Sequence, residues 1–358
     1  MTTNEMAPRS QHPVGDAQGE TGLPRGSAAP LATVYDAALL DLDGVVYLGG
    51  KAIPGAADAL GQAKHLGMRL AFVTNNASRS PSAIAAQLTG LGVPATADDV
   101  VTSAQAAARL LAARLPAGAP VLVVGGIGLR IALRERRLRP VSTAAEHPQA
   151  VVQGYAADIS YGLLAEAATA IRAGAWFVAS NADATLPSPR GPQPGNGSLI
   201  QVLVTATGQH PVVAGKPEPP LHAEAVQRTA ATRPLVVGDR LDTDIEGAVR
   251  GNADSLLVLT GVSQPADAVL APPEMRPTYL ARDLDGLLTG HPAVTPGDGG
   301  FQCGGWTARL DADGGRLELS GSSEPIDGLR ALCGAAWSGG TVTPDMAASA
   351  VKGLDLSS

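Results

Sequence analysis

Near-continuous runs of hydrophobic residues, each broken by glycine or polar residues, recur along this chain. The first spans residues 34–40, where Val, Tyr, Ala and Leu follow one another as in a strand that is covered on both faces. Similar runs lie at 70–73, 121–124, 176–179 and 235–238. These runs predict buried β-strands.

Helical periodicity fills the intervals between the predicted strands. From Ala56 to Leu66 the apolar residues recur at helical spacing, and Gly67 stands where a C-terminal cap belongs. Ser80 and Pro81 open another helix with a capping side chain and a first-turn proline. Further helices are expected from Ser103, at 129–138, at 163–172 and from Gly197. This alternation predicts an α/β fold with a doubly wound parallel sheet.

The first strand ends in two carboxylates, Asp41 and Asp43, which are followed by Gly44. Glycine lets the chain turn sharply, and the ligands of open α/β sheets bind beyond the carboxyl ends of the strands. Because the backbone bends past the strand end, the two carboxylates can take different tasks, one attacking while the other handles a proton. An Asp-x-Asp-Gly sequence by itself is also compatible with a calcium loop or a surface turn.

A second acidic group follows the run at 235–238. Asp239 comes just beyond the predicted strand, Asp244 falls near the first turn of the next helix, and Asp242 is expected to be more exposed. Carboxylates gathered at one sheet edge repel one another, so a hard divalent metal is implied, with Mg²⁺ the natural choice. For Asp242 and Asp244 the alternative is ordinary charge at a helix N-terminus, which the helix dipole favours.

These segments resemble, in order, the motifs of the haloacid dehalogenase-like (HAD) hydrolases. The matching stretches are Asp41-Leu-Asp-Gly, Thr74-Asn-Asn, Gly215-Lys-Pro and Gly238-Asp-Arg-Leu-Asp-Thr-Asp. The resemblance implies a Rossmann-like core in which Asp41 is the nucleophile and Asp43 the general acid and base. A lone lysine is usually a solvated surface charge, but Lys216 follows a strand and is flanked by Gly and Pro.

The same resemblance implies the remaining roles at the site. Phosphate would be held by Thr74, Asn75, Asn76 and Lys216. Magnesium would be held by the carboxylates of Asp41 and Asp239 and the backbone carbonyl of Asp43. Asp244 would orient Lys216 or a water molecule bound to the metal. An aspartate at position 43 occurs in phosphatases and phosphomutases of this family, whereas its dehalogenases and ion-pumping ATPases lack it. A magnesium-dependent phosphatase that forms an aspartyl-phosphate is therefore expected, with a phosphomutase and a non-catalytic scaffold as alternatives.

The interval between the second and third motifs reads as a small α/β module, in the place where the large-cap subclass IIA phosphatases carry their cap. We therefore expect a core at 34–114 and 211–290 and an inserted cap at 115–210, with 211–214 returning the chain to the core sheet. Candidate specificity contacts in the cap are Asn181, Asp183 and Arg190, for each of which a structural role is at least as plausible.

The two ends of the chain differ from this pattern. Residues 1–33 contain Pro, Gly, Ser and Gln with no apolar run of signal-peptide length, so a disordered leader is expected. Residues 291–358 form an extension with a predicted hairpin at 306–319 and a helix at 327–337, an α+β unit that resembles an acetyltransferase-like tail. Because it lacks a glycine-rich pyrophosphate loop, a packing or regulatory role is favoured over acetyl transfer.

Composition narrows the expected partners. With 358 residues and 45% hydrophobic content the chain can form a substantial core, and a net charge of −7 argues against a nucleic-acid partner. Cys303 and Cys333 have no metal-ligand spacing, which is typical of a reducing cytoplasm, and no membrane association is expected. For the oligomeric state, a homodimer is one of the expected possibilities.

The expected substrate is a small phosphorylated metabolite. The overall pattern, with its C-terminal extension, most resembles glycerol-3-phosphate phosphatases of actinobacteria, so glycerol 3-phosphate is the first expectation. Phosphoglycolate, pyridoxal phosphate, a nucleotide monophosphate and 4-nitrophenyl phosphate are the alternatives.

Overall fold

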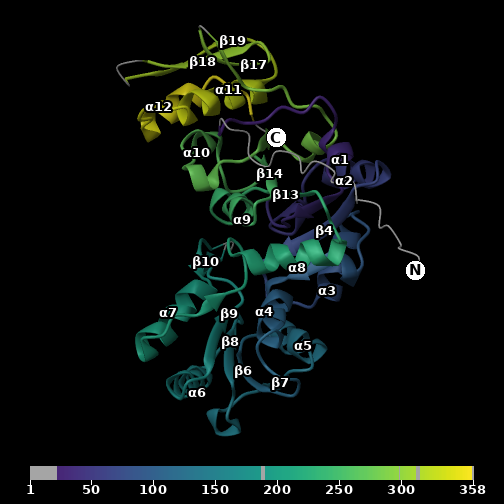
Figure 1. Ribbon diagram of the computed structural model, residues 1–358, viewed down its shortest axis with the longest axis vertical. Helices are drawn as coiled ribbons and strands as arrows, with labels where there is room; N and C mark the ends of the chain where they lie inside the picture. Colours follow the sequence, from purple (N-terminus) through teal and green to yellow (C-terminus); the bar gives the residue numbers. More distant parts are fainter. Residues whose placement is uncertain (1–21, 187–189, 298, 312–314, 357–358) are drawn as a thin grey trace, which may run out of the picture.

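The computed structural model describes residues 22–186, 190–297, 299–311 and 315–356. Figure 1 shows three parts stacked along the longest axis of the molecule. A central α/β core lies between a smaller α/β module, at the bottom of the view, and a sheet-and-helix layer formed by the C-terminal segment, at the top. None of the described helices is long and apolar enough to cross a lipid bilayer.

The core is built on a six-stranded parallel sheet with the strand order β15-β14-β13-β1-β4-β5. Its strands are β1 (Ala37–Leu40), β4 (Arg69–Thr74), β5 (Val100–Thr102), β13 (Pro234–Gly238), β14 (Asp254–Val258) and β15 (Tyr279–Ala281). The helices around it are α1 (Leu31–Val34), α2 (Ala56–His65), α3 (Pro81–Gly90), α4 (Ser103–Ala112), α8 (Pro219–Thr229), α9 (Glu246–Arg250) and α10 (Pro265–Val269).

Both faces of this sheet are covered by helices, which explains the uninterrupted hydrophobic character of β1. Leu40 packs in a cluster with residues of α2 and α3, whereas its neighbour Leu39 packs in another with residues of α4 and α8. Successive side chains of a strand point to opposite faces, so both must be apolar here. The predicted doubly wound parallel sheet is confirmed.

A second parallel sheet follows β5 in the chain, with the order β12-β9-β8-β6-β7. Its strands are β6 (Pro120–Val124), β7 (Arg139–Val141), β8 (Ala150–Gln153), β9 (Trp176–Ala179) and β12 (Val212–Val213). The associated helices are α5 (Ile127–Glu135), α6 (Tyr161–Arg172) and α7 (Asn196–Thr207). Two short antiparallel ribbons are also present. One pairs β2 (Tyr47–Leu48) with β3 (Lys51–Ala52) between β1 and α2 of the core, and the other pairs β10 (Thr185–Leu186) with β11 (Gln193–Pro194) between β9 and α7.

One predicted boundary is corrected by the second sheet. Residues 211–214 were expected to return the chain to the core sheet, but β12 pairs in parallel with β9, Val212 opposite Val178. The amide of Ala214 also donates to the carbonyl of Ala179 at 2.9 Å. A two-residue hydrophobic strand carries no periodicity that tells one parallel sheet from another, so only the pairing itself decides.

The C-terminal segment forms an antiparallel sheet in the order β16-β17-β18-β19, with two helices beside it. The elements are β16 (Thr295–Gly297), β17 (Gly300–Cys303), β18 (Trp306–Leu310), β19 (Leu317–Gly321), α11 (Pro325–Trp337) and α12 (Pro344–Val351). The predicted hairpin and helix are therefore present. Leu329 and Leu332 of α11 share one hydrophobic cluster with Leu257 of β14 and Leu280 of β15, so the extension packs directly on the core.

The predicted disordered leader is wrong for its last part. Residues 1–21 lie outside the described residues, but 22–33 are ordered against the core. The amide of Ser27 donates to the carbonyl of His291 at 2.8 Å, and the His291 amide returns a bond of 2.7 Å to Ser27. Arg25 forms an ion pair of 2.9 Å with Asp254. These contacts join distant parts of the chain, and the local composition of the leader does not reveal them.

A buried polar group holds the extension to the core. The guanidinium of Arg330 on α11 donates to Asp327 at 2.6 Å, to the carbonyl of Leu280 and, at 2.9 Å, to Nδ1 of His291. Nε2 of His291 lies 2.8 Å from the carbonyl oxygen of Gly286. Since Arg330 can only donate, Nδ1 is the accepting nitrogen and the imidazole is held in its neutral form.

The neutrality of His291 predicts an acid-sensitive stability. Burial, with the Arg330 charge, lowers the pKa of His291 from 6.5 to about 4. A histidine whose pKa is depressed by folding stabilises the protein fully above pH 6.5, and this contribution is lost as the pH falls toward 4. We expect urea unfolding followed at several pH values to show this loss, and the slope to be smaller in His291→Gln. The exposed His210→Gln is the matched control, and an unchanged slope in His291→Gln would contradict the account.

Candidate active site

Three neighbouring strands of the core sheet, β13, β1 and β4, end at the same edge. Asp239 follows β13, Asp41 follows β1, and Thr74 is the last residue of β4. The amide of Asp41 donates to the carbonyl of Val237 at 2.9 Å, which ties the two strand ends together. The fold thus brings these predicted residues to the sheet edge where α/β proteins bind their ligands.

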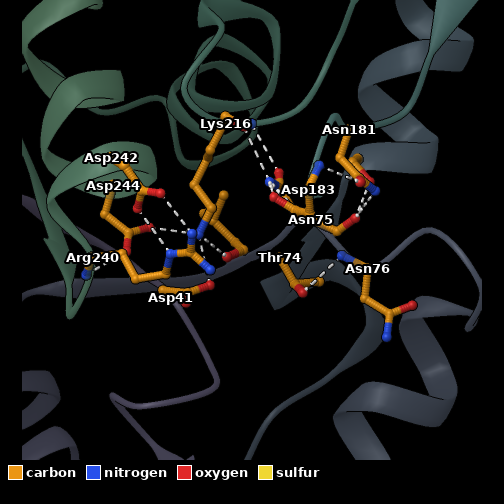
Figure 2. A network of polar contacts seen from close by, with 12 residues as sticks. Asp41, Thr74, Asn75, Asn76, Asn181, Asp183, Lys216, Arg240, Asp242 and Asp244 are labelled. Atoms are coloured by element: carbon orange, nitrogen blue, oxygen red, sulfur yellow. Dashed lines mark hydrogen bonds and ion pairs between the residues drawn. The ribbon is translucent and has the colours of Figure 1, made fainter. Parts of the chain in front are cut away.

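Lys216 lies at the centre of this edge with 4% of its surface exposed. Its Nζ donates to Oδ1 of Asp41 and to Oδ1 of Asp244, each at 2.6 Å, as Figure 2 shows. Burial alone lowers the pKa of a lysine, but the neighbouring charges of Asp244 and Asp41 outweigh it and raise the pKa of Lys216. The lysine therefore stays charged and holds both carboxylates.

Asp239 adds a third carboxylate to this group. Oxygen atoms of Asp41, Asp239 and Asp244 all lie within 4.8 Å of one another. Oδ2 of Asp239 accepts a hydrogen bond of 2.7 Å from the Val262 amide, whereas its buried Oδ1 has no hydrogen-bond partner among the described residues. Burial, followed by repulsion from Asp244 and Asp41, raises the pKa of Asp239 to about 7.

The charge balance of this cluster fits a divalent metal. Three carboxylates face one lysine, and burial also raises the pKa of Asp41. A buried oxygen without a partner is costly, and a hard cation would satisfy the Asp239 oxygen while neutralising the excess negative charge. The residues present therefore fit the predicted magnesium site, with Asp41 and Asp239 as carboxylate ligands.

Two glycines pack closely against the Asp239 carboxylate. Gly44 has a φ of +88°, and a Cβ added there would lie 2.3 Å from Oδ2 of Asp239. A Cβ added at Gly261 would lie 2.0 Å from the same oxygen. Both positions exclude a side chain, since no L-residue could fit without displacing Asp239.

Substituting Gly44 should therefore damage the site through Asp239. We expect Gly44→Ala to lower kcat/KM or the apparent magnesium affinity by roughly 10- to 100-fold, the range seen when groups that support a metal site are disturbed. Gly49→Ala is the matched control, because Gly49 also has a positive φ, +56°, but has nothing within 4 Å of the added Cβ. Equal losses in the two variants would mean that backbone strain alone is responsible.

Asp43 lies in a tight turn two residues beyond Asp41. The amide of Gly44 donates to the carbonyl of Tyr47 at 2.7 Å, and the turn leads into the β2–β3 ribbon. Burial raises the pKa of Asp43, an effect that a backbone hydrogen bond from Gly49 opposes and the charge of Asp41 reinforces. A raised pKa suits a carboxyl group that must carry a proton during part of a reaction cycle.

Asn75 holds the lysine loop in place. Its Oδ1 accepts from the Lys216 amide at 2.8 Å, and its Nδ2 donates to the Lys216 carbonyl at 3.1 Å. Nδ2 also lies 3.2 and 3.3 Å from the two carboxylate oxygens of Asp183. The sequence predicted a phosphate contact for Asn75; its side chain is engaged with Lys216 and Asp183.

The other two residues of the Thr-Asn-Asn segment differ from each other. Thr74 is 8% exposed, and its hydroxyl oxygen accepts from the Asn76 amide at 3.1 Å. Oδ1 of Asn76 accepts from the amide and hydroxyl of Ser78 at 2.9 and 2.7 Å, so this side chain turns toward its own loop. Figure 2 shows it pointing away from Asp41. The structure brings Thr74 to the cluster and leaves the Asn76 side chain outside it.

Two of the three predicted cap residues contact the core. Asn181, which follows β9, donates to the carbonyl of Asn75 at 2.7 Å, and Asp183 accepts from the Asn75 side chain. Arg190 is exposed and follows residues 187–189, which lie outside the described part of the chain. Asn181 and Asp183 thus meet the core beside Lys216.

Sequence reasoning missed Arg240, the residue directly after Asp239. Its guanidinium forms two hydrogen bonds to Asp242, at 2.9 and 2.7 Å, and its backbone amide donates to Asp244 at 3.2 Å. Its charge also acts on Asp183 across the junction with the second α/β module. The sequence did contain a sign of this role, because an arginine placed among aspartates has carboxylates within reach to form ion pairs. Asp242 itself is exposed, as predicted.

Comparison with known proteins matches this arrangement to one family. Residues 38–139 match the haloacid dehalogenase-like hydrolase model, and residues 213–287 match a HAD-hydrolase-like model. A D-glycerol 3-phosphate phosphatase from Mycobacterium tuberculosis is 48% identical over 310 residues, which cover 86% of this chain and 87% of that protein.

The chain belongs to the haloacid dehalogenase-like hydrolases. The predicted family is therefore confirmed, and this hydrolase is a phosphatase-type member with a Rossmann-like core. An acid sugar phosphatase from Staphylococcus saprophyticus is 37% identical over 256 residues, covering 71% of this hydrolase and 97% of the relative.

A solved structure agrees with the fold of the hydrolase over nearly its whole length. The glycerol phosphate phosphatase from Mycobacterium tuberculosis in complex with magnesium aligns with a TM-score of 0.82 and 44% identity. The alignment covers 92% of this chain and 100% of that one. The extension of the hydrolase, at residues 303–356, matches a GCN5-related N-acetyltransferase-like domain, in line with the predicted resemblance.

Proposed function

We propose that this hydrolase is a magnesium-dependent phosphatase that converts glycerol 3-phosphate to glycerol and phosphate through an aspartyl-phosphate. The observation that carries the substrate is the similarity to the mycobacterial D-glycerol 3-phosphate phosphatase, which extends over 310 residues at 48% identity and covers 86% of this chain. The observation that supports the chemistry is the buried Lys216 between Asp41 and Asp244.

Asp41 is the proposed nucleophile. Lys216 holds its Oδ1, which leaves the second carboxylate oxygen to attack phosphorus in line. A phosphate monoester dianion repels an anionic nucleophile, so the reaction depends on positioned positive charge. Lys216 supplies that charge at the nucleophile, and Asp244 on its other side fixes the direction of the ammonium group.

Asp43 is the proposed proton carrier. In the first step it protonates the leaving alcohol, and in the second it takes a proton from the water that hydrolyses the aspartyl-phosphate. Its raised pKa supports the acid role, and the charge of Asp41 contributes to that raised pKa.

The phosphoryl oxygens are contacted from the neighbouring loop in this proposal. The Thr74 hydroxyl accepts from the Asn76 amide and keeps its own proton for a phosphoryl oxygen. Asn75 acts through Lys216, because it accepts from the Lys216 amide and donates to the Lys216 carbonyl. For Asn76 we propose a backbone contribution, because its side chain is engaged by Ser78.

Magnesium would be held by the carboxylates of Asp41 and Asp239 and the backbone carbonyl of Asp43. When bound, the metal supplies positive charge that polarises the phosphoryl group and offsets the repulsion among the acids. The unpartnered Oδ1 of Asp239 supports this assignment.

The domain roles are also part of the proposal. Residues from 115 through β12 act as a cap over the core, with Asn181, Asp183 and Arg190 as substrate contacts, and the extension at 291–358 acts as a packing element. We place the activity in the cytoplasm, consistent with Cys303 and Cys333 being buried free thiols. If two copies associate, we propose that they pair through the inserted module.

Phosphate release from a panel of small phosphate monoesters tests this function. With magnesium present we expect glycerol 3-phosphate to give the highest kcat/KM, and EDTA to abolish turnover until magnesium is restored. In Asp239→Asn, the same magnesium concentration should not restore turnover. Preference for another ester of the panel would replace the proposed substrate, and transfer to a second sugar phosphate without free phosphate would indicate a mutase.

A further inference from the structure

A short loop of the core is bonded to Asp239, one of the carboxylates of the proposed metal site. The loop spans residues 259–264, between β14 and α10. The Val262 amide donates to Oδ2 of Asp239 at 2.7 Å, and the Ser263 amide donates to the Asp239 backbone carbonyl at 3.0 Å. The Ser263 hydroxyl accepts from the amide of Leu241 at 3.1 Å. The loop therefore holds both the side chain and the backbone of Asp239.

The loop leads directly into α10, a helix of five residues. Isolated helices shorter than about 12 residues are marginal in water, so α10 depends on what packs against it. Ala268 and Val269 of α10 are buried and share a hydrophobic cluster with Leu329 and Leu332 of α11. Figure 1 shows α10 beside α11 and α12, where the extension meets the core. The extension therefore covers the helix that follows the Asp239 loop.

Trp337, the last residue of α11, makes a directed contact with this helix. Its indole Nε1 donates to the carbonyl of Ala268 at 3.2 Å, and the residue is 6% exposed. The guanidinium of Arg276 lies over the indole ring, 5.4 Å from the ring centroid, and its Nε donates to the carbonyl of Ala271 at 3.2 Å. Trp337 is thus bound to α10 itself and, through Arg276, to the segment that follows α10.

We propose that Trp337 is a positioning residue for magnesium, because it fixes α10 and thereby the loop at 259–264 that holds Asp239. The Val262 bond occupies Oδ2 of Asp239 and leaves Oδ1, which has no partner among the described residues, for the metal. Trp337 itself contacts neither metal nor substrate. This inference rests on the proposed magnesium site and deepens it, since it gives the extension a part in metal binding beyond packing.

The test compares Trp337→Phe with the wild-type full-length protein. Phenylalanine keeps an aromatic ring in the cluster but removes the Nε1 donor. We expect magnesium binding, measured by isothermal titration calorimetry, to weaken by about threefold to tenfold, less than the roughly 10- to 100-fold that follows loss of a group bonded directly to a metal ligand. With glycerol 3-phosphate as substrate, kcat at saturating magnesium should stay near the wild-type value, because excess metal refills the site.

Trp306→Phe is the matched control, because the Nε1 of Trp306 donates at 3.1 Å to the carbonyl of Glu324 within the extension. This variant should bind magnesium as the wild-type protein does. An unchanged magnesium affinity in Trp337→Phe overturns the proposal, and so does an equal loss of affinity in the two variants.

Hydrogen exchange of the metal-free proteins, followed by mass spectrometry, reports on the loop directly. In Trp337→Phe, residues 259–264 should exchange faster, whereas β4, which lies beyond β1 in the sheet, should be unchanged. Faster exchange in β4 as well would indicate general destabilisation and overturn the proposal. A wild-type protein that binds no magnesium refutes the proposed metal site instead, and the exchange of residues 259–264 then still decides whether Trp337 positions the Asp239 loop.

Discussion

The Asp41→Asn variant should fold and be almost inactive. We expect phosphate release to fall by on the order of 10⁴-fold or more, because removing a nucleophile eliminates the covalent route altogether. Its unfolding midpoint should stay at or above that of the wild-type protein in the absence of metal. Asparagine can still accept from Lys216, and the exchange removes one of the three carboxylates that crowd within 4.8 Å.

The control for this comparison is Asp58→Asn, which makes the same chemical change on the exposed surface of α2. Steady-state phosphate release and a thermal melt of the three proteins give both quantities. Substantial activity in Asp41→Asn would show that another group attacks phosphorus. An unfolded Asp41→Asn protein would show that the carboxylate is needed for the fold.

The second large effect is expected at Lys216, where substitution should reduce both stability and activity. Lys216→Met removes the cation while Asp41 and Asp244 stay buried, and breaking such a pair costs roughly 3–5 kcal/mol. We expect urea unfolding monitored by circular dichroism to show a loss of this size, and turnover to be lost with it. The reason is electrostatic, since methionine fills much of the same volume.

Removing one of the stranded charges should recover part of the lost stability. The double variant Lys216→Met/Asp244→Asn is expected to be more stable than Lys216→Met and to remain inactive. Lys352→Met, at an exposed position, controls for the loss of a lysine elsewhere. If the double variant were less stable than the single one, the destabilisation would have to come from packing.

The strands that carry the site could be predicted from the sequence because their chemistry is local. The run before Asp41 is hydrophobic at every position facing either layer, and the polar residues begin where the strand ends. The same signal located Thr74 and Asp239, and parallel pairing of β13, β1 and β4 then brings these ends together. Hydrophobic pattern and sheet geometry therefore determine most of the core site.

The contacts between modules could not be predicted in this way. Asn75 was expected to face phosphate, but its amide reaches Lys216 and Asp183, which lie 141 and 108 positions away in sequence. The position of β12 beside β9 and the ordering of 22–33 by Ser27 and His291 also depend on partners that are not neighbours in the chain. None of these partners leaves a periodic signal in the neighbouring sequence.

The buried charges show a second limit of sequence reasoning. The roles of Asp242 and Asp244 were open from spacing alone, and the structure separates them by burial. The Asp242 side chain is 56% exposed and bonded to Arg240, whereas that of Asp244 is 1% exposed and bonded to Lys216. The two residues are only two positions apart, but one face of this turn packs against the core and the other faces solvent. Asp244 therefore lies on the buried face and Asp242 on the exposed one.

Detection of the covalent intermediate tests the central claim, attack by Asp41, most directly. In Asp43→Asn the second step should be slowed, while 4-nitrophenyl phosphate, whose leaving group needs no proton, still reacts in the first. We predict a burst of nitrophenolate stoichiometric with enzyme, followed by slow turnover. Mass spectrometry of the acid-quenched, digested protein should then locate the phosphoryl group on Asp41. A phosphoryl group on any other residue would contradict the assignment of Asp41 as the nucleophile.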